Sequence, residues 1–414
     1  MNKKAIKCGK LFDSVNSKVL ENVVITVEDD KITGVVPAAE ASLEGCCVID
    51  LGDKFVTPGL IDCHVHLTMD GEPAGNGSEN TTIGEWTLYA LNNARKDLMA
   101  GFTMLRVCGG RGFADEAVRN YINKGVFWGP RLMTAGYCNG STGGHSDDHY
   151  NPYLVDELNS QTIGDGPADM MRAVRYNIKH GADFIKFMST GGVMSLGTTV
   201  GAQQLSFEEM KAIVDTAKMY GVITGTHAHG TSGINDAIRA GVTTIEHGMI
   251  MNEESFALMK EHGTTLIPTL IAAERIVVKG REIGVPEWAV KKAETVFNTA
   301  TGGFKRCVGD GITVAFGTDS GTPFNFHGKQ AYEFELLTRY GMTVEQALAA
   351  ATRVASQVLR KDDQIGSIEA GKFADIAAFD GDPREDITAM TRCSFVMKGG
   401  VVYKKDGKAT AEAL

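Results

Sequence analysis

The stretch PGLIDCHVH, residues 58–66, decides how the rest of this chain is interpreted. It is an apolar run that ends in two histidines, His64 and His66, separated by one residue. In a β-strand, side chains at positions i and i+2 point to the same side, so both imidazoles are expected to face one way. Two ligands of one metal ion need this arrangement. A His-x-His pair at a strand end can also be two histidines that only make hydrogen bonds. Other residues of the chain are therefore needed to distinguish a metal site from such a pair.

Seven more apolar runs follow and alternate with amphipathic helical stretches. The eight runs lie at residues 59–66, 102–107, 131–135, 184–188, 222–227, 243–247, 264–270 and 312–317. Strands that alternate with helices predict a parallel sheet. Eight such units over roughly 300 residues predict an α/β fold of the (β/α)₈ TIM-barrel type across residues 58–362. An open doubly wound sheet is the alternative, but no Gly-x-Gly-x-x-Gly turn follows the first run.

Both ends of the chain have the pattern of short β-strands separated by turn-forming residues. The segments lie at residues 4–12, 23–27, 31–36 and 47–50, and again at 365–368, 374–379, 395–398 and 401–404. We expect residues 1–57 and 363–414 to combine into one small β-sandwich domain, with the barrel domain inserted between them.

Composition narrows the class of protein. The 414 residues have a net charge of −10, and no dense basic run predicts nucleic-acid binding. No run of about 18 apolar residues predicts a membrane span, and the first residues lack the apolar core of a signal peptide. The eight cysteines include no Cys-x-x-Cys pair, which is typical of reduced thiols. We expect a cytoplasmic protein with a small-molecule partner, without nucleic-acid or membrane binding, and we leave a homo-oligomer open.

Three other predicted strand ends carry residues that bind metals. His227 ends the fifth run, His247 ends the sixth, and Asp319 follows the eighth. In a (β/α)₈ barrel the carboxyl ends of all strands meet at one face, where active sites lie. These residues would therefore converge on His64 and His66. Imidazole and carboxylate ligands suit zinc or a similar divalent ion.

Lys186 interrupts the predicted fourth strand, where an apolar side chain is expected. A buried amine is costly unless it is paired or loses its charge. One interpretation is an ion pair with Asp183 or Glu246. The other is carboxylation by CO₂, which would make the side chain an anionic carbamate that bridges two metal ions. The residues alone leave both open.

Taken together, these residues resemble the amidohydrolase superfamily. The matching positions are PGLIDCHVH at 58–66, Lys186, His227, His247, Asp319 and the later strand KFADI at 372–376. More narrowly, THAHG at 226–230, TIEHG at 244–248 and GGH at 143–145 are similar to the metal-dependent Xaa-dipeptidase branch, which is prolidase-like and includes ochratoxinase-like amidases.

The resemblance implies a centre of two divalent metal ions, for which we expect zinc. The implied ligands are His64, His66 and Asp319 for the more buried ion, His227 and His247 for the second, and the CO₂-derived carbamate of Lys186 as the bridge. Two such ions would activate a water to hydroxide at neutral pH and polarise a substrate carbonyl. Asp319 would be the catalytic residue, because it could take the proton of that water and give it to the leaving nitrogen.

Candidates for substrate binding lie in the loops that follow the strands. They are His145, His229, Tyr137, Gly191 and Gly192. The two histidines either order their surroundings or, as the resemblance implies, bind the α-carboxylate of a substrate's C-terminal amino acid. The two glycines would let backbone amides approach the substrate, and Tyr137 would line the same pocket.

We therefore expect a binuclear-metal hydrolase that cleaves the C–N bond of dipeptides, Xaa-Pro or similar, or of N-acyl amino acids. A cyclic-amide hydrolase of the imidazolonepropionase type is the alternative enzyme, and it would bind no free carboxylate next to the cleaved bond. A non-catalytic barrel scaffold is a third reading, and the complete ligand set argues against it.

Overall fold

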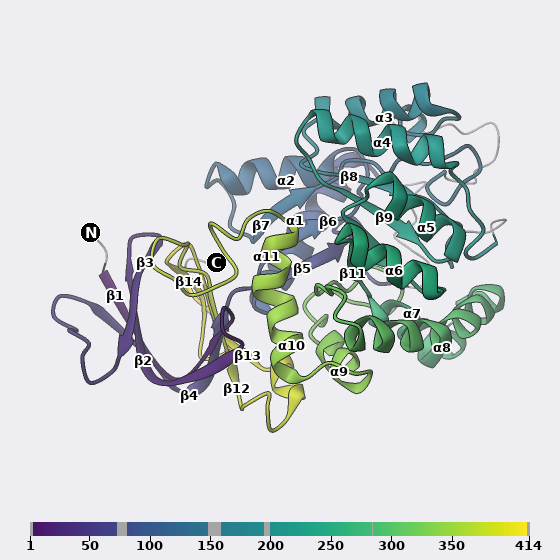
Figure 1. The fold of residues 1–414 in the computed structure, drawn as a ribbon. Coiled ribbons are helices and arrows are strands. Elements are labelled where there is room, and N and C mark those ends of the chain that lie inside the picture. Colours follow the sequence, from purple (N-terminus) through teal and green to yellow (C-terminus); the bar gives the residue numbers. More distant parts are fainter. Residues whose placement is uncertain (1–2, 73–80, 148–158, 194–198, 284, 412–414) are drawn as a thin grey trace.

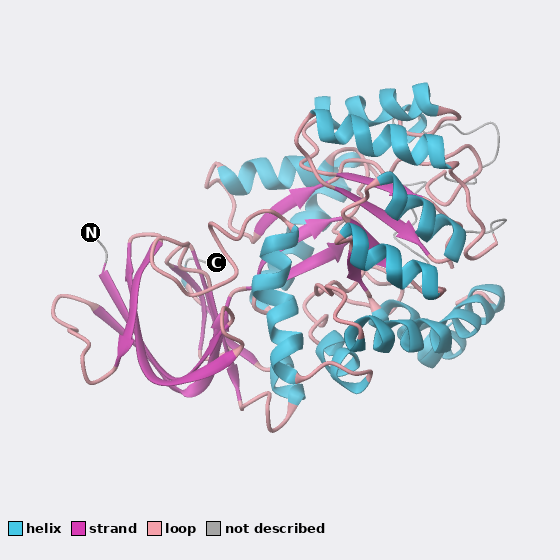
Figure 2. Cartoon of the chain, in the orientation of Figure 1, coloured by secondary structure: helices cyan, strands magenta, loops and turns pink. Residues whose placement is uncertain are grey.

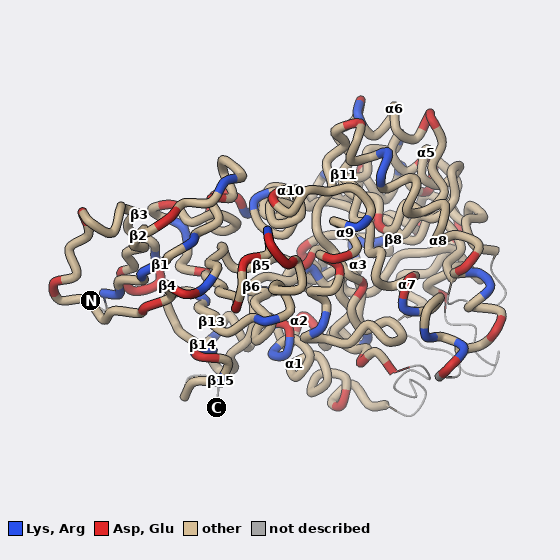
Figure 3. Tube along the Cα trace, turned by 90° about the horizontal axis from the view of Figure 1, so that it is seen from below, with Lys and Arg blue, Asp and Glu red and all other residues tan. Residues whose placement is uncertain are grey.

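The computed structural model describes residues 3–72, 81–147, 159–193, 199–283 and 285–411. The chain forms a β-rich part from its two ends and an α/β part from the residues between them (Figure 1). Acidic and basic positions are interspersed over both parts of the described chain (Figure 3).

The β-rich part is one eight-stranded sheet with the order β15-β14-β13-β12-β4-β1-β2-β3. Its strands are β1 (Lys3–Asp13), β2 (Lys18–Glu28), β3 (Lys31–Pro37), β4 (Cys47–Pro58), β12 (Ile376–Asp380), β13 (Cys393–Lys398), β14 (Val401–Lys405) and β15 (Lys408–Ala409). Antiparallel pairing of β4 with β12 joins the two ends of the chain. The sheet curls (Figure 1), and Ile32 N–H donates to Lys372 O at 3.0 Å. The expected sandwich is thus a single sheet curled around an apolar core that includes Ile6, Ile25 and Met397.

One predicted terminal strand is wrong. Residues 365–368 form no strand, because the backbone turns at Gly366, where φ is +88°. A Cβ at this position would lie 2.2 Å from Oγ of Ser356. The apolar side chain of Ile365 that suggested a strand is buried against the α/β part instead.

Seven of the eight predicted runs in the middle of the chain are strands, and they form two parallel sheets. The first sheet contains β5 (Leu60–Val65), β6 (Phe102–Val107) and β7 (Arg131–Thr134), and the second contains β8 (Ile185–Met188), β9 (Thr224–Ala228), β10 (Thr244–His247) and β11 (Thr265–Ile267). Nearly all their side chains are buried. This burial on both faces explains why the strands have continuous apolar runs rather than alternating ones.

The eighth run, residues 312–317, makes one isolated β-bridge, between Val314 and Leu266. Its backbone still bonds to both neighbouring strands, because Leu266 N–H donates to Thr313 O and Cys63 N–H donates to Phe316 O, each at 2.9 Å. On the other side, Asn139 N–H donates to Lys186 O at 2.9 Å. Backbone hydrogen bonds therefore link the two sheets at both of their edges.

Helices cover the outside of the two parallel sheets (Figure 2). They are α1 (Ile83–Met99), α2 (Ala114–Asn123), α3 (Pro167–Lys179), α4 (Phe207–Met219), α5 (Thr231–Ala240), α6 (Glu253–His262), α7 (Leu270–Lys279), α8 (Glu287–Gly309), α9 (Tyr332–Arg339), α10 (Val344–Ala349) and α11 (Ala355–Val358). Several begin with side-chain caps, as at α4, where Ser206 and Glu209 form a capping box. Of the described helices, none combines the length and the apolar character needed to cross a membrane.

Candidate active site

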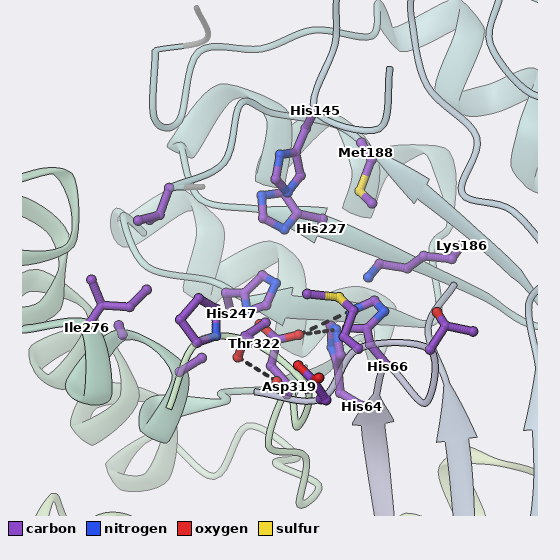
Figure 4. Close-up of a pocket in the computed structure, with 18 of the residues that line it drawn as sticks. His64, His66, His145, Lys186, Met188, His227, His247, Ile276, Asp319 and Thr322 are labelled. Atoms are coloured by element: carbon purple, nitrogen blue, oxygen red, sulfur yellow. Dashed lines mark hydrogen bonds and ion pairs between the residues drawn. The ribbon is translucent and has the colours of Figure 1, made fainter. Parts of the chain in front are cut away.

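A cavity of about 440 Å³ opens at the carboxyl ends of the parallel strands. All six predicted metal-site residues line it, together with two further histidines: His64, His66, Lys186, His227, His247 and Asp319, and then His145 and His229. Figure 4 shows the side chains of the six predicted metal-site residues and of His145 directed into the same space. The parallel arrangement of the strands thus brings together residues up to about 250 positions apart in the sequence.

His64, His66 and Asp319 form a compact group. Oδ1 of Asp319 lies 3.3 Å from Nε2 of His64 and 3.2 Å from Nε2 of His66. Their candidate ligand atoms all lie within 4.8 Å of one another. Burial raises the pKa of Asp319, but the neighbouring imidazoles of His64 and His66 outweigh it and hold this pKa well below its usual range. The carboxylate is therefore anionic at neutral pH, as a metal ligand must be.

The other ring nitrogen of each histidine is already bonded. Nδ1 of His64 lies 2.9 Å from Oε2 of Glu246, and Nδ1 of His66 lies 2.9 Å from the carbonyl oxygen of Gly109. Because an oxygen accepts at each Nδ1, each Nδ1 carries a proton, and a metal ion would be bound through Nε2. Histidines that bind metals are usually oriented by such an outer hydrogen bond. The geometry fits a divalent ion bound through the two Nε2 atoms and Asp319.

His227 and His247 form a second group on the neighbouring strands. Their ring centroids are 4.7 Å apart. Among the described residues, Nε2 of His227 is buried and has no hydrogen-bond partner, whereas Nδ1 of His247 lies 2.6 Å from Oγ1 of Thr269. Burial lowers the pKa of both imidazoles well below the ordinary value, so both are neutral. An unpaired nitrogen on a buried neutral imidazole fits a metal ion as its missing partner.

Strained backbone occurs at these positions. His247 has φ 71° and Asp319 has φ 62°, and non-glycine residues adopt such left-handed conformations at a cost of about 1–3 kcal/mol each. Thr269, which contacts His247, is also left-handed, with φ 44°. Strained backbone conformations of this kind cluster at functional sites, where they orient side chains.

Lys186 is 1% exposed, and Figure 4 shows its amine directed into the cavity. The structure does not support either predicted ion pair, because Asp183 pairs with Arg119 and Glu246 pairs with Arg106. Within the described part of the chain, the amine has no hydrogen bond or ion pair. The remaining interpretation, loss of the amine's charge by carboxylation, fits this environment.

Of the predicted substrate-binding residues, His145 and His229 lie beside the second histidine pair. The His227 ring centroid is 4.2 Å from that of His145 and 4.3 Å from that of His229. Burial lowers the pKa of His145 to about 4 and the pKa of His229 to about 3. Both imidazoles are therefore neutral at pH 7, and each can donate one N–H to a substrate oxygen.

The other three predicted substrate-binding residues lie outside the cavity lining. The hydroxyl of Tyr137 accepts the N–H of Gly112 at 2.7 Å, and the Gly191 N–H donates to Ala202 O at 2.9 Å. Gly192 leaves room for His145 instead, because a Cβ at position 192 would lie 2.3 Å from the His145 ring. Part of the glycine-rich loop that carries His145, from residue 148 onward, lies outside the described residues.

Two further residues support this site and were not predicted from the sequence. Arg106 lies fully buried beneath the His64 group, and Thr269 contacts His247. Arg106 interrupts an apolar strand just as Lys186 does, so the same signal was present in the sequence. Thr269 carries no comparable signal, because a threonine at the end of a strand is ordinary.

Comparison with known proteins places the chain in a family. The sequence profile of the amidohydrolase family matches residues 55–403. The chain is 32% identical over 378 residues to ochratoxinase of Aspergillus niger. The aligned region covers 84% of this chain and 76% of that protein.

Two solved structures are similar over nearly the whole chain. A Xaa-Pro dipeptidase with bound methionine in its active site has a TM-score of 0.92 at 34% identity, covering 97% of this chain and 100% of that one. A prolidase in complex with N-methylphosphonate-L-proline has a TM-score of 0.89 at 29% identity, covering 98% and 100%. The resemblance inferred from the sequence is confirmed: the chain belongs to the amidohydrolase family, in its prolidase- and ochratoxinase-like branch, and is a hydrolase of amide-type C–N bonds.

Proposed function

We propose that this chain is a binuclear-metal amide hydrolase that cleaves dipeptides, Xaa-Pro or similar, or N-acyl amino acids. One observation carries the proposal: the His64, His66 and Asp319 group lies beside the His227 and His247 pair in one cavity. Each group offers ligands for one divalent ion, and zinc suits the donor set. Carboxylated Lys186 would be the bridge, and its unpaired buried amine supports that assignment.

Two ions bound here would lower the pKa of a water and polarise the substrate carbonyl. Asp319 would hold the water through its anionic carboxylate and take up the water's proton. It would then deliver that proton to the leaving nitrogen, which would otherwise depart as an unstable amide anion. Because the pKa of Asp319 is low, its carboxylate is ionised before the reaction and would carry this proton only transiently.

The substrate's free carboxylate would lie against His145 and His229, whose neutral imidazoles can each donate an N–H to an oxygen. Apolar side chains also line the wall of the cavity, among them Met69, Met188, Val193, Met249 and Ile276. Such a wall favours an apolar substrate side chain, because burying it gains about 25 cal/mol per Å² of apolar area. We therefore propose dipeptides or N-acyl amino acids with an apolar residue as the preferred substrates.

We also propose that the two parallel sheets and residues 312–317 form one closed (β/α)₈ barrel over residues 58–362. Backbone hydrogen bonds at both sheet edges support closure. Residues 1–57 and 363–414 would then be the second, β-rich domain. A cytoplasmic location stays a prediction.

An activity panel tests this proposal. Enzyme loaded with zinc and bicarbonate would be assayed against Xaa-Pro dipeptides, other apolar and charged dipeptides, N-acyl amino acids and a cyclic amide. We expect turnover of the substrates with a free carboxylate, fastest for those with an apolar residue. Turnover of the cyclic amide alone would support the imidazolonepropionase-type alternative and would refute the dipeptidase proposal.

A further inference from the structure

The buried Arg106 joins three strands beneath the candidate metal site. Its side chain, on β6, is 0% exposed. One guanidinium nitrogen donates to Oε1 of Glu246 on β10 at 2.7 Å, and another donates to Oγ1 of Thr244 at 3.0 Å. Its Nε donates to the carbonyl oxygen of Cys63 on β5, next to His64. Arg106 is thus fixed by its own contacts and has no access to the cavity.

Glu246 is equally buried and has both carboxylate oxygens occupied. Oε1 accepts from Arg106 and from Oγ1 of Thr244, and Oε2 accepts from Nδ1 of His64 at 2.9 Å. Contacts on both oxygens fix the plane of the carboxylate and, through it, the plane of the His64 ring. The ring then presents Nε2 toward Asp319.

A glycine makes room for this network. Gly225 on β9 lies between Lys186 on β8 and Thr244 on β10 in the strand register. A Cβ at Gly225 would lie 2.7 Å from Oε1 of Glu246 and 3.3 Å from a guanidinium nitrogen of Arg106. The carboxylate therefore occupies the space above Gly225, on the same side as the lysine.

Glu246 is a buried anion near the Lys186 amine, whose charge is one of the causes that lower the pKa of Glu246. A buried cation gains most from such a carboxylate. Arg106 neutralises that carboxylate, and the Lys186 amine stays unpaired among the described residues. We propose that Arg106 is a positioning residue. Its ion pair holds the Glu246 carboxylate against His64, so that Glu246 does not pair with Lys186 and the Lys186 amine can take part in the metal centre. The inference rests on the proposed binuclear site.

The test compares zinc binding by variants of Arg106 and of a second arginine. Arg106→Met removes the charge and the donors at similar length. Arg119→Met is the matched control, since Arg119 also pairs with a carboxylate, that of Asp183, at the amino end of β8. Zinc stoichiometry and zinc affinity would be measured by metal analysis and by competition with a chelator, alongside thermal unfolding. We expect Arg106→Met to lose 10- to 100-fold in zinc affinity, and Arg119→Met to bind zinc like the unmodified enzyme.

A double variant separates positioning from packing. Replacing Glu246 by glutamine in the Arg106→Met background removes the uncompensated charge, while the amide oxygen can still accept from His64. We expect zinc affinity to recover at least tenfold relative to Arg106→Met alone, a gain that a packing defect would not give. Arg106→Lys keeps the charge but not the planar set of donors, and it serves as the second variant if the methionine variant does not fold. We expect a smaller loss of zinc affinity for Arg106→Lys than for Arg106→Met.

The outcomes are distinct. If the unmodified enzyme binds two zinc ions and both Arg106 variants bind them as tightly, the positioning role is refuted while the proposed function stands. If the double variant binds zinc no better than Arg106→Met, the role through Glu246 is refuted. If the unmodified enzyme itself binds no zinc, the proposed function fails first.

Discussion

Oγ1 of Thr269 lies 2.6 Å from Nδ1 of His247, so that hydroxyl determines which nitrogen of the ring is left for the cavity. Thr269→Val removes the hydroxyl but keeps the β-branched shape, and the left-handed backbone is no more strained than before. We expect this variant to bind the second zinc ion about 10- to 100-fold more weakly, as measured by chelator competition. Thr269→Ser, which keeps the hydroxyl, should bind like the unmodified enzyme. Equal zinc affinity in the valine variant would contradict the orienting role.

Lys186→Ala should lose bound metal and activity, because the bridging anion would be missing. Short-chain carboxylates such as acetate or propionate fit the space left by the side chain and can supply bridging oxygens. We expect them to restore part of both zinc content and turnover in this variant but not in the unmodified enzyme. An alanine variant that retains two zinc ions without added carboxylate would show that Lys186 is not a bridge.

His145→Ala should raise KM for substrates with a free C-terminal carboxylate. A charge-assisted hydrogen bond contributes about 1.5–3 kcal/mol, so the increase should be tenfold or more. The matched comparison is the same dipeptide with an amidated C-terminus, whose already poorer KM should change little. If both substrates respond equally, His145 does not bind the carboxylate.

The pH dependence of stability should report on Asp382 in the β-rich part. Burial raises the pKa of Asp382, but its bonds with Arg384 and Lys10 outweigh this and hold the pKa well below its usual range. The carboxylate therefore stabilises the fold above the unfolded pKa of about 3.9 and loses that effect as pH falls toward the folded value.

Asp382→Asn should thus lower the free energy of unfolding by about 1 kcal/mol near pH 7. Urea unfolding of variant and unmodified protein at several pH values measures this. The difference should shrink as the pH falls below about 4. A difference that grows toward acid would reverse the sign and exclude the ion-pair explanation.

Strand periodicity was enough to bring the metal-site candidates together. The i, i+2 spacing placed His64 and His66 on one side of the chain at the end of β5, and the parallel topology explains how His227, His247 and Asp319 reach the same cavity. Their convergence on one cavity follows from backbone geometry alone, whereas their role as metal ligands stays a prediction. The charged Lys186 in an apolar strand stood out for the same reason.

Other features depend on tertiary contacts that periodicity does not encode. The hydroxyl of Tyr137 accepts a hydrogen bond from the Gly112 N–H outside the cavity lining. The Gly191 N–H donates to the carbonyl oxygen of Ala202. Residues 365–368 have a strand-like composition but turn at Gly366. Arg106 carried a visible signal, yet its role emerges only once β6 and β10 are seen to place it against Glu246.

The metal content of the purified chain is the decisive measurement for the proposed binuclear site. Protein loaded with zinc and bicarbonate, then freed of unbound metal, would be measured by elemental analysis and assayed on the same sample. We expect two divalent ions per chain, with dipeptide or N-acyl-amino-acid hydrolysis that rises as the second site fills. Fewer than one ion per chain, unrecovered by zinc and bicarbonate, would contradict it.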